Sequence, residues 1–304
     1  MTRVTDLKRI NWPFEGKLHN DAKLIEEKVN EWFKVYCKTN EMEEKYRQQR
    51  VPQFSSRNFN YGPFEKVLAI AKFHSYIFAF DDYFELEDDD AVEKLTANIL
   101  SPSLENINFG ENQWLHRGFN DVWECVSNLA PDEWNERQLN TIITWLKTIQ
   151  MEKKFRNNVI PSSLEYLTLR PVSVGINMCF NFIEHAYGQY LSFETIAHPF
   201  FQAMLQHCRC IILATNDIYS YHKEQQSKAD TMNLVMVYQN ELNLSLEEAF
   251  DKVYDYNDEN LRYYLMYKER VQATVKQDIQ FYLHGLEQLI VGSYEFHFDS
   301  NRYD

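Results

Sequence analysis

Two groups of oxygen-bearing side chains in this sequence have the types and spacing of a divalent-metal site. The first group follows a very apolar stretch, where Asp81 and Glu85 lie four residues apart and would share one helix face. Carboxylates held this close repel each other unless a cation bridges them, and oxygen ligands select hard ions, above all Mg²⁺. A solvated helix end is an equally good interpretation of this group alone, because an acidic run at residues 87–90 follows directly.

The second group is Asn216, Ser220 and Glu224, which occur at intervals of four residues. On a helix, an amide, a hydroxyl and a carboxylate would therefore stack along one stripe. Such a set carries little charge and suits a divalent ion whose other ligands are waters and phosphate oxygens. Taken alone, an ordinary polar helix face is a slightly better interpretation.

Helices must position both groups, because apolar residues recur with a period near 3.6 and no convincing strand alternation occurs. The pattern predicts helices over residues 64–85, 132–156 and 199–219, and capping boxes at residues 162–165 and 245–248 predict two further helix starts. We expect one all-α domain of about ten or more helices. It would span residues 1–304, with an N-terminal extension over residues 1–20.

One expected helix contains two breakers. Pro171 and Gly175 lie within an apolar helical stretch. Proline removes a hydrogen bond from the helix, and glycine allows backbone conformations that other residues avoid. We therefore expect a kinked or broken helix here, with backbone carbonyls that lack a helical partner.

Composition narrows the possible partners and the compartment. The formal net charge of −14 disfavours a nucleic-acid surface, since phosphate backbones need clustered cations. No stretch reaches the ~20 apolar residues of a membrane span, and the N-terminus has no secretory pattern. The five cysteines form no CxxC pair, which favours free thiols in a cytoplasmic protein.

Together the two groups resemble the aspartate-rich motif and the NSE motif, (N/D)Dxx(S/T)xxxE, of class I terpene synthases of the microbial, single-α-domain type. Arg170 lies 46 residues before Asn216, which is the offset of the diphosphate-sensing arginine in microbial members. Lys223 precedes Glu224, as a diphosphate-contacting lysine often does in the family. Arg302 and Tyr303 match the C-terminal Arg-Tyr pair. The resemblance covers roughly residues 60–304.

The resemblance implies a helical bundle around a central apolar cavity, a prenyl diphosphate substrate and three Mg²⁺ ions. Within it, Asp81, Arg170 and Val174 would be the catalytic residues, with Val174 offering a carbonyl at the helix break. The implied metal ligands are Asp81, Asp82, Glu85, Asn216, Ser220 and Glu224. The implied diphosphate ligands are Arg170, Lys223, Arg302 and Tyr303.

Four apolar or aromatic residues near the two motifs are candidates to line the cavity. His74, Ile77 and Phe78 precede Asp81 by seven, four and three residues, and Leu213 precedes Asn216 by three. Such a lining would exclude water from a carbocation, and ring faces would stabilise its charge. For any one of these residues, ordinary core packing is the better interpretation.

The implied function is ionisation of an acyclic prenyl diphosphate, with farnesyl diphosphate as the expected substrate, and cyclisation of the carbocation to a sesquiterpene. A diterpene synthase acting on geranylgeranyl diphosphate is an alternative, as is a geranyl diphosphate preference. An isoprenyl diphosphate synthase is disfavoured, because those enzymes carry a second aspartate-rich motif in place of an NSE. A catalytically silent helical protein would need all these spacings to be coincidental. The resemblance also implies a homodimer as one possible oligomeric state, because homodimers are common in the family.

Overall fold

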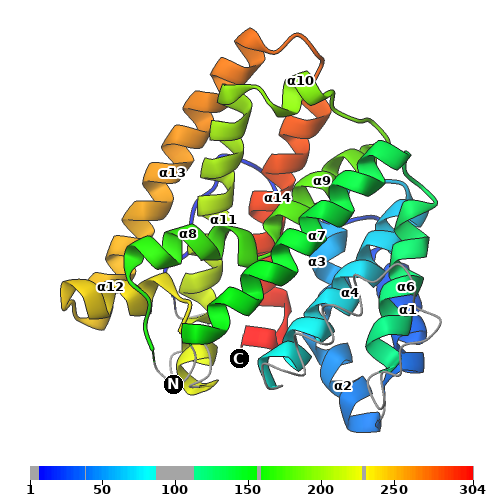
Figure 1. Ribbon diagram of the computed structural model, residues 1–304, viewed down its shortest axis with the longest axis horizontal. Helices are drawn as coiled ribbons and strands as arrows, with labels where there is room; N and C mark the ends of the chain where they lie inside the picture. Colours follow the sequence, from blue (N-terminus) through cyan, green and yellow to red (C-terminus); the bar gives the residue numbers. More distant parts are fainter. Residues whose placement is uncertain (1–6, 38, 87–112, 156–158, 228–230, 304) are drawn as a thin grey trace.

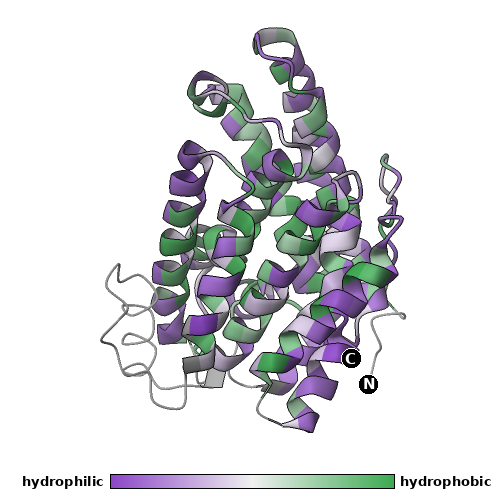
Figure 2. Cartoon of the chain, turned by 90° about the vertical axis from the view of Figure 1, so that its right-hand side faces the viewer, coloured by the Kyte–Doolittle hydropathy of each residue, from purple (hydrophilic) through white to green (hydrophobic). Residues whose placement is uncertain are grey.

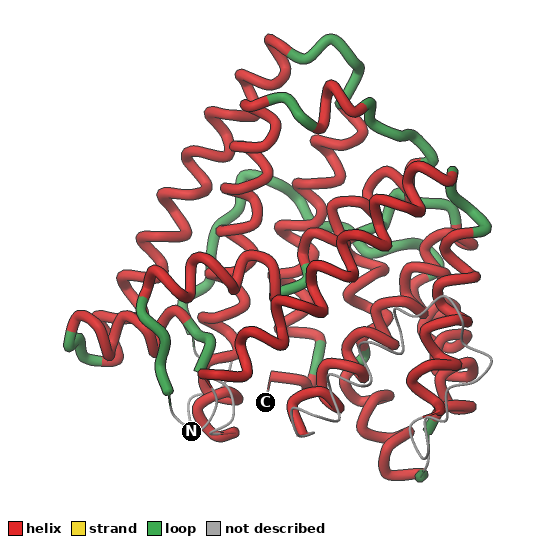
Figure 3. Tube along the Cα trace, in the orientation of Figure 1, coloured by secondary structure: helices red, strands yellow, loops and turns green. Residues whose placement is uncertain are grey.

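The computed structural model describes residues 7–37, 39–86, 113–155, 159–227 and 231–303, and within these ranges all regular structure is helical (Figure 3). This confirms the all-α class expected from the sequence. The helices are α1 (Ala22–Phe33), η2 (Lys34–Tyr36), α2 (Asn40–Gln49), α3 (Val51–Asn58), α4 (Phe64–Leu86), α6 (Gln113–Ser127), α7 (Asp132–Glu152), η5 (Lys153–Phe155), α8 (Ser163–Ser173), α9 (Ile176–Tyr187), α10 (Phe193–Ile196), α11 (Pro199–Ser227), α12 (Leu234–Leu242), α13 (Leu246–Thr274), α14 (Gln280–Asp299) and η6 (Asn301–Tyr303).

The predicted helix starts agree closely with the structure, whereas some ends differ. Both capping boxes are present: Ser162 and Glu165 cap α8, and Ser245 and Glu248 cap α13. Helix α11 continues to Ser227, eight residues beyond the predicted end, because no breaker interrupts it. All three NSE-type residues therefore lie on one uninterrupted helix.

The helices pack as a bundle in which the carboxyl-terminal ends of α4, α7 and α11 converge near the C-terminus, at the lower edge of Figure 1. Helix α11 packs against α13 and α14, while α4 packs against α1, α3 and α6. Figure 2 shows apolar residues along the inward sides of the helices and polar residues along the outer sides. Burial of these apolar stripes holds the bundle together.

The expected helix break lies between α8 and α9. Pro171 is inside the last turns of α8, and Gly175 adopts a left-handed conformation with φ of +78°. A side chain is strained in that conformation, so glycine is favoured at this position. The indole of Trp145, from α7, donates a hydrogen bond to the carbonyl of Ser173 at 2.8 Å. The break is thus held by a side chain from a neighbouring helix.

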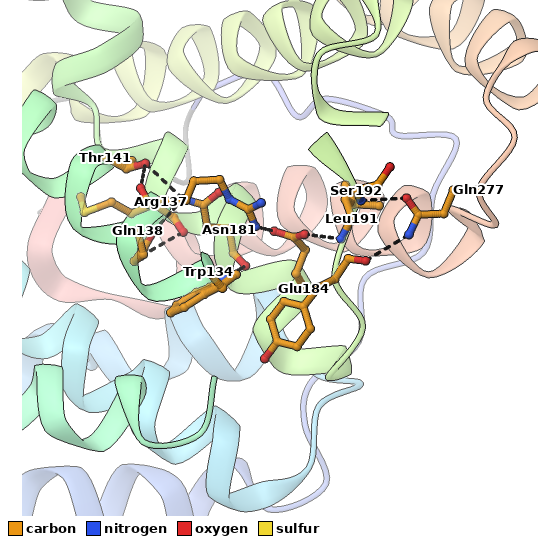
Figure 4. A network of polar contacts seen from close by, with 11 residues as sticks. Trp134, Arg137, Gln138, Thr141, Asn181, Glu184, Leu191, Ser192 and Gln277 are labelled. Atoms are coloured by element: carbon orange, nitrogen blue, oxygen red, sulfur yellow. Dashed lines mark hydrogen bonds and ion pairs between the residues drawn. The ribbon is translucent and has the colours of Figure 1, made fainter. Parts of the chain in front are cut away.

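A polar network joins α7, α9 and the loops that follow α9 (Figure 4). Arg137 forms an ion pair with the buried Glu184, which also accepts a hydrogen bond from the backbone N–H of Leu191 at 2.6 Å. Gln277, between α13 and α14, accepts from the backbone N–H of Ser192 at 3.0 Å. These contacts fix α9 against α7 and against the chain connection that precedes α14.

Candidate active site

A cavity of about 190 Å³ is lined by residues of α4, α7, α11 and the C-terminal η6. Residues of η5, of the α8–α9 junction and at positions 231–232 complete its wall. The lining combines aromatic and aliphatic side chains with charged ones of both signs. The residues lining it are Ile77, Phe78, Asp81, Phe84, Trp145, Ile149, Glu152, Lys153, Phe155, Arg170, Ser173, Val174, Gly175, Asn216, Ser220, Lys223, Glu224, Thr231, Met232, Arg302 and Tyr303.

The two aspartates at the end of α4 face different surroundings. Asp81 lines the cavity, and its Oδ2 lies 3.5 Å from Arg302 Nη2. Asp82 is not in the cavity wall: it is buried and accepts hydrogen bonds from Lys45 Nζ and Arg302 Nη1, both at 2.8 Å. The metal-ligand role implied for Asp82 is therefore not favoured, because its carboxylate already has two cationic partners.

Those partners set the protonation of Asp82. Burial alone would raise its pKa, but Arg302 and Lys45 outweigh burial and lower the pKa to about 2. In return, the carboxylates of Asp82 and Asp81 raise the pKa of Arg302, although burial opposes this. Asp82 and Arg302 thus form a permanently charged pair at the edge of the cavity. Glu85 lies one turn after Asp81 on α4, and its side chain lies outside the described residues.

Asn216, Ser220 and Glu224 all line the cavity from α11, as their spacing indicates. Ser220 is 2% exposed, and among the residues that the structure describes its Oγ has no hydrogen-bond partner. Leaving a buried hydroxyl without a partner costs free energy, so such an atom marks a place where a ligand would bind.

These side chains fit a hard divalent ion. Within the described ranges no group of three or more His, Cys, Asp or Glu side chains comes together, so an ion bound at α11 would need the amide and hydroxyl oxygens of Asn216 and Ser220. Oxygen donors of this kind are those that Mg²⁺ accepts alongside water and phosphate.

Two buried residues hold the α11 site in place. Asn233, the N-cap of α12, donates to Glu224 Oε2 at 2.7 Å and to the backbone carbonyl of Asp217 at 2.8 Å. Asp217 is fully buried, accepts a hydrogen bond from the hydroxyl of Tyr166 and lies 3.7 Å from Arg170 Nη2. Neither role follows from the four-residue spacing, since Asn233 caps a different helix and Asp217 is not one of the spaced positions.

The four cationic or hydroxyl-bearing residues implied as diphosphate ligands all line the same cavity. They are Arg170, Lys223, Arg302 and Tyr303. Arg170 Nη2 donates to Asn216 Oδ1 at 3.2 Å, which joins the end of α8 to the proposed metal ligands. Arg302 and Tyr303 are the buried residues of η6. Burial raises the pKa of Tyr303 to about 12, so its hydroxyl keeps its proton at neutral pH.

Ile77, Phe78 and Val174 line the cavity, whereas His74 and Leu213 do not. His74 is on the same face of α4 but two turns away, where α3 and α9 pack over it. Its Nδ1 lies 2.8 Å from Ser55 Oγ, and four phenylalanine rings surround it: Phe54, Phe59, Phe73 and Phe182. Leu213 is fully buried in the core on α11. For these two residues the ordinary core interpretation is correct.

One wall of the cavity was not predicted from the sequence. Trp145, Ile149 and Lys153 approach it from α7 and η5 at intervals of four residues. Glu152 lies beside them and accepts a hydrogen bond from the hydroxyl of Ser173. The four-residue spacing that ends in a charged residue is the same signal that marks α4, so it could have identified this wall.

Comparisons with known proteins identify the family of this chain. Residues 72–262 match the family described as terpene synthase family 2, C-terminal metal binding. The chain is 28% identical to the (+)-eremophilene synthase of Sorangium cellulosum over 76% of this chain and 72% of that protein. It is 24% identical to a 4-epi-cubebol synthase of Streptosporangium roseum, over 96% and 90% respectively. Sesquiterpene synthase 1 of Postia placenta is 25% identical over 76% of this chain and 69% of that protein.

Solved structures agree on the fold. The crystal structure of α-eudesmol synthase has a TM-score of 0.83 at 19% identity and covers 96% of this chain and 99% of that one. Germacradien-4-ol synthase from Streptomyces citricolor has a TM-score of 0.80 at 18% identity, covering 95% and 98%. No helix within the described residues is both long and apolar enough to cross a membrane. By its matched metal-binding region and its all-α class I fold, the chain belongs to the terpene synthase family, whose members are lyases acting on prenyl diphosphates.

Proposed function

We propose that this protein is a Mg²⁺-dependent sesquiterpene synthase that ionises farnesyl diphosphate and cyclises the resulting carbocation. The observation that carries the proposal is the convergence of Asp81, the three α11 oxygen donors and Arg170 on one partly apolar cavity. The relatives support the choice of substrate, since the name of the 4-epi-cubebol synthase specifies cyclisation of (2E,6E)-farnesyl diphosphate.

Asp81 and Glu85 would hold Mg²⁺ at the end of α4, and Asn216, Ser220 and Glu224 would hold it at α11, three ions in all. The bound ions supply Lewis-acid stabilisation of the charge that develops on the leaving diphosphate. They also explain how a protein of net charge −14 accepts an anionic substrate, because the local field near bound cations is positive.

The cationic side chains would bind and orient the diphosphate. Arg170 and Arg302 offer planar guanidinium groups that hydrogen-bond two phosphate oxygens at once, while Lys223 offers a point charge. The hydroxyl of Tyr303 would stay protonated and donate a hydrogen bond to the diphosphate, since its pKa is about 12. Lys153, which lines the cavity from η5, is a further candidate for this role.

The apolar wall would protect the carbocation from water. Phe78, Phe84 and Trp145 line the cavity together with Ile77 and Ile149. Aromatic faces stabilise a nearby positive charge by roughly 0.5–2 kcal/mol each. The carbonyl of Val174, at the helix break, would supply a negative dipole close to the bond that breaks.

The relatives favour a C15 substrate over a longer one, since several of them are named sesquiterpene synthases. An isoprenyl diphosphate synthase is disfavoured too, because α11 offers an amide and a hydroxyl where a second aspartate-rich motif would stand. A homodimer and a cytoplasmic location stay predictions.

The direct test is product analysis by gas chromatography and mass spectrometry. Geranyl, farnesyl and geranylgeranyl diphosphate are offered separately, each with Mg²⁺ and with excess chelator. We expect a C15 hydrocarbon or alcohol from farnesyl diphosphate, lost on chelation. A C20 product alone would contradict the proposed chain length, and longer diphosphates formed with added isopentenyl diphosphate would favour a prenyltransferase.

A further inference from the structure

A buried histidine outside both motifs contacts two elements of the site. His297, on α14, is 4% exposed and does not line the cavity. Its Nε2 lies 3.5 Å from Asn216 Nδ2, and its ring centroid lies 4.4 Å from that of Tyr303. It therefore joins a proposed metal ligand to the C-terminal pair, although no sequence motif includes it.

The hydrogen bond at the other ring nitrogen defines the tautomer of His297. Nδ1 lies 3.2 Å from the backbone carbonyl of Tyr294, and a carbonyl oxygen can only accept. Nδ1 must therefore carry the proton, which leaves Nε2 of the neutral ring as an acceptor. The buried position favours the neutral ring. The group that faces Nε2 must then be a donor, and for Asn216 only Nδ2 can donate.

This contact fixes which way the Asn216 amide points. With Nδ2 donating to His297, Oδ1 is on the opposite side, where Arg170 Nη2 donates to it at 3.2 Å. A flipped amide would place two acceptors together at His297 and two donors together at Arg170. In the observed orientation the amide oxygen faces Arg170, which lines the cavity, and a metal ion needs that oxygen because an NH₂ group cannot coordinate it.

The two anchors of this amide differ in what the reaction demands of them. Arg170 would also bind the diphosphate in the proposed function, so its guanidinium would serve two partners at once. His297 has no such second task, and the Tyr303 ring packs against it. In the proposed function, the contact with His297 would keep the Asn216 oxygen available to the ion while Arg170 also binds the diphosphate.

We propose that His297 is a positioning residue that orients the Asn216 amide for metal binding. The inference rests on the proposed function of the α11 site. It assigns to α14 a role in metal affinity that is separate from its role in packing.

The test is metal affinity measured without turnover. Mn²⁺ binding is followed by electron paramagnetic resonance in the presence of inorganic diphosphate, for the parent protein, His297→Leu and His297→Gln. Loss of an outer-shell partner typically costs 10–100-fold in metal affinity, so we expect a loss of about tenfold or more in His297→Leu. His297→Gln should recover most of it, because its amide can donate to the Tyr294 carbonyl and accept from Asn216.

Two controls separate orientation from general damage. Tyr294→Phe removes a buried hydroxyl on the same helix, which accepts from the backbone N–H of Ile10 at 3.2 Å, and should leave Mn²⁺ affinity unchanged. In an Asn216→Asp background the ligand has two equivalent oxygens, so adding His297→Leu should cost little further affinity. If His297→Leu alone binds Mn²⁺ as the parent does, or if His297→Gln is equally impaired, the inference is overturned.

A spectroscopic measurement on the parent protein covers the case in which His297→Leu does not fold. Nitrogen NMR of ¹⁵N-histidine-labelled protein, with the His297 resonance assigned from the His297→Gln spectrum, should show protonated Nδ1 and bare Nε2. The opposite tautomer would overturn the inference. If the parent bound no Mn²⁺ at all, the proposed function of the site would fail first, which distinguishes the two outcomes.

Discussion

Arg302 Nη1 donates to Asp82 Oδ1 at 2.8 Å, which joins the C-terminal η6 to the end of α4 across 220 positions of the chain. Arg302 also contacts the cavity lining at this edge. Its guanidinium lies 3.5 Å from the Asp81 carboxylate and 4.9 Å from the ring centroid of Phe78. The same guanidinium thus contacts an aspartate outside the cavity wall, an aspartate within it and an aromatic residue of its lining. Removing it should affect stability and catalysis together.

Replacement of this arginine is the first prediction. Arg302→Met leaves the buried Asp82 with Lys45 as its remaining cationic partner, and we expect the free energy of unfolding to fall by about 2–4 kcal/mol. Product formation should fall at least tenfold, because the diphosphate loses a ligand. Urea unfolding and product assays measure the two effects. Arg50→Met is the control: Arg50 pairs with Glu26 at the surface, where such pairs contribute about 0–1 kcal/mol. Equal losses of stability in the two variants would contradict this account.

The spacing of residues within a helix was enough to predict that Asn216, Ser220 and Glu224 share one face of α11. Asn216, Ser220 and Glu224 lie on one uninterrupted helix, so a four-residue interval places them on one stripe whatever surrounds them. The fold class follows for the same reason, since the apolar period is a property of each helix alone.

Other features depend on contacts between distant segments, which the sequence pattern does not contain. The Asp82 carboxylate lies outside the cavity wall, where it accepts hydrogen bonds from Lys45 of α2 and Arg302 of η6. His74 has the face expected for the lining, yet α3 and α9 cover it. Helix periodicity gives the direction of a side chain, but the neighbouring helices decide whether that direction is a cavity or the core.

Ser220 should separate metal binding from stability. Ser220→Ala removes a buried hydroxyl that has no partner among the described residues, so the free energy of unfolding should change by less than about 0.5 kcal/mol. The Mg²⁺ concentration needed for half-maximal activity should nevertheless rise about tenfold or more. Thr215→Ala on the same helix is the matched control, because its hydroxyl donates to the Ile211 carbonyl at 2.8 Å. That variant should lose some stability and keep the Mg²⁺ requirement. A Mg²⁺ requirement unchanged by Ser220→Ala would remove this serine from the ligand set.

Two tryptophans of α7 allow a matched comparison at the helix break. Trp145 Nε1 donates to the Ser173 carbonyl at 2.8 Å, and Trp134 Nε1 donates to the Asn181 carbonyl at 2.9 Å. Replacing either by Phe keeps an aromatic ring and removes one hydrogen bond, so each should cost about 1 kcal/mol of stability. Only Trp145 lines the cavity. Trp145→Phe should therefore change the ratio of products, with more early-quenched acyclic alcohol, while Trp134→Phe should not. Gas chromatography measures the product profile of each variant. Identical profiles from the two variants would show that the α8–α9 break does not influence the product ratio.

The acid sensitivity of the fold should depend on a buried histidine far from the proposed ligands. His185 is fully buried against Trp134 and Phe182, and among the described residues its ring nitrogens have no hydrogen-bond partner. Burial, with a smaller contribution from Lys66, lowers the pKa of His185 to about 3 from an ordinary 6.5. Below pH 6.5 the unfolded chain binds a proton at this position that the folded chain does not. The contribution of His185 to the free energy of unfolding is therefore at its full value above pH 6.5. It declines by up to about 1.4 kcal/mol per pH unit as the pH falls toward 3.

His185→Phe should remove that part of the pH dependence, since Phe fills a similar volume and does not titrate. The free energy of unfolding, measured in urea at pH 7, 6, 5 and 4, should decline less steeply in the variant than in the parent. Phe182→Leu, which changes a neighbouring core residue that does not titrate, should lower stability by a similar amount at every pH and leave the slope unchanged. Parallel curves for the parent and His185→Phe would show that this histidine is not the group that couples folding to protonation.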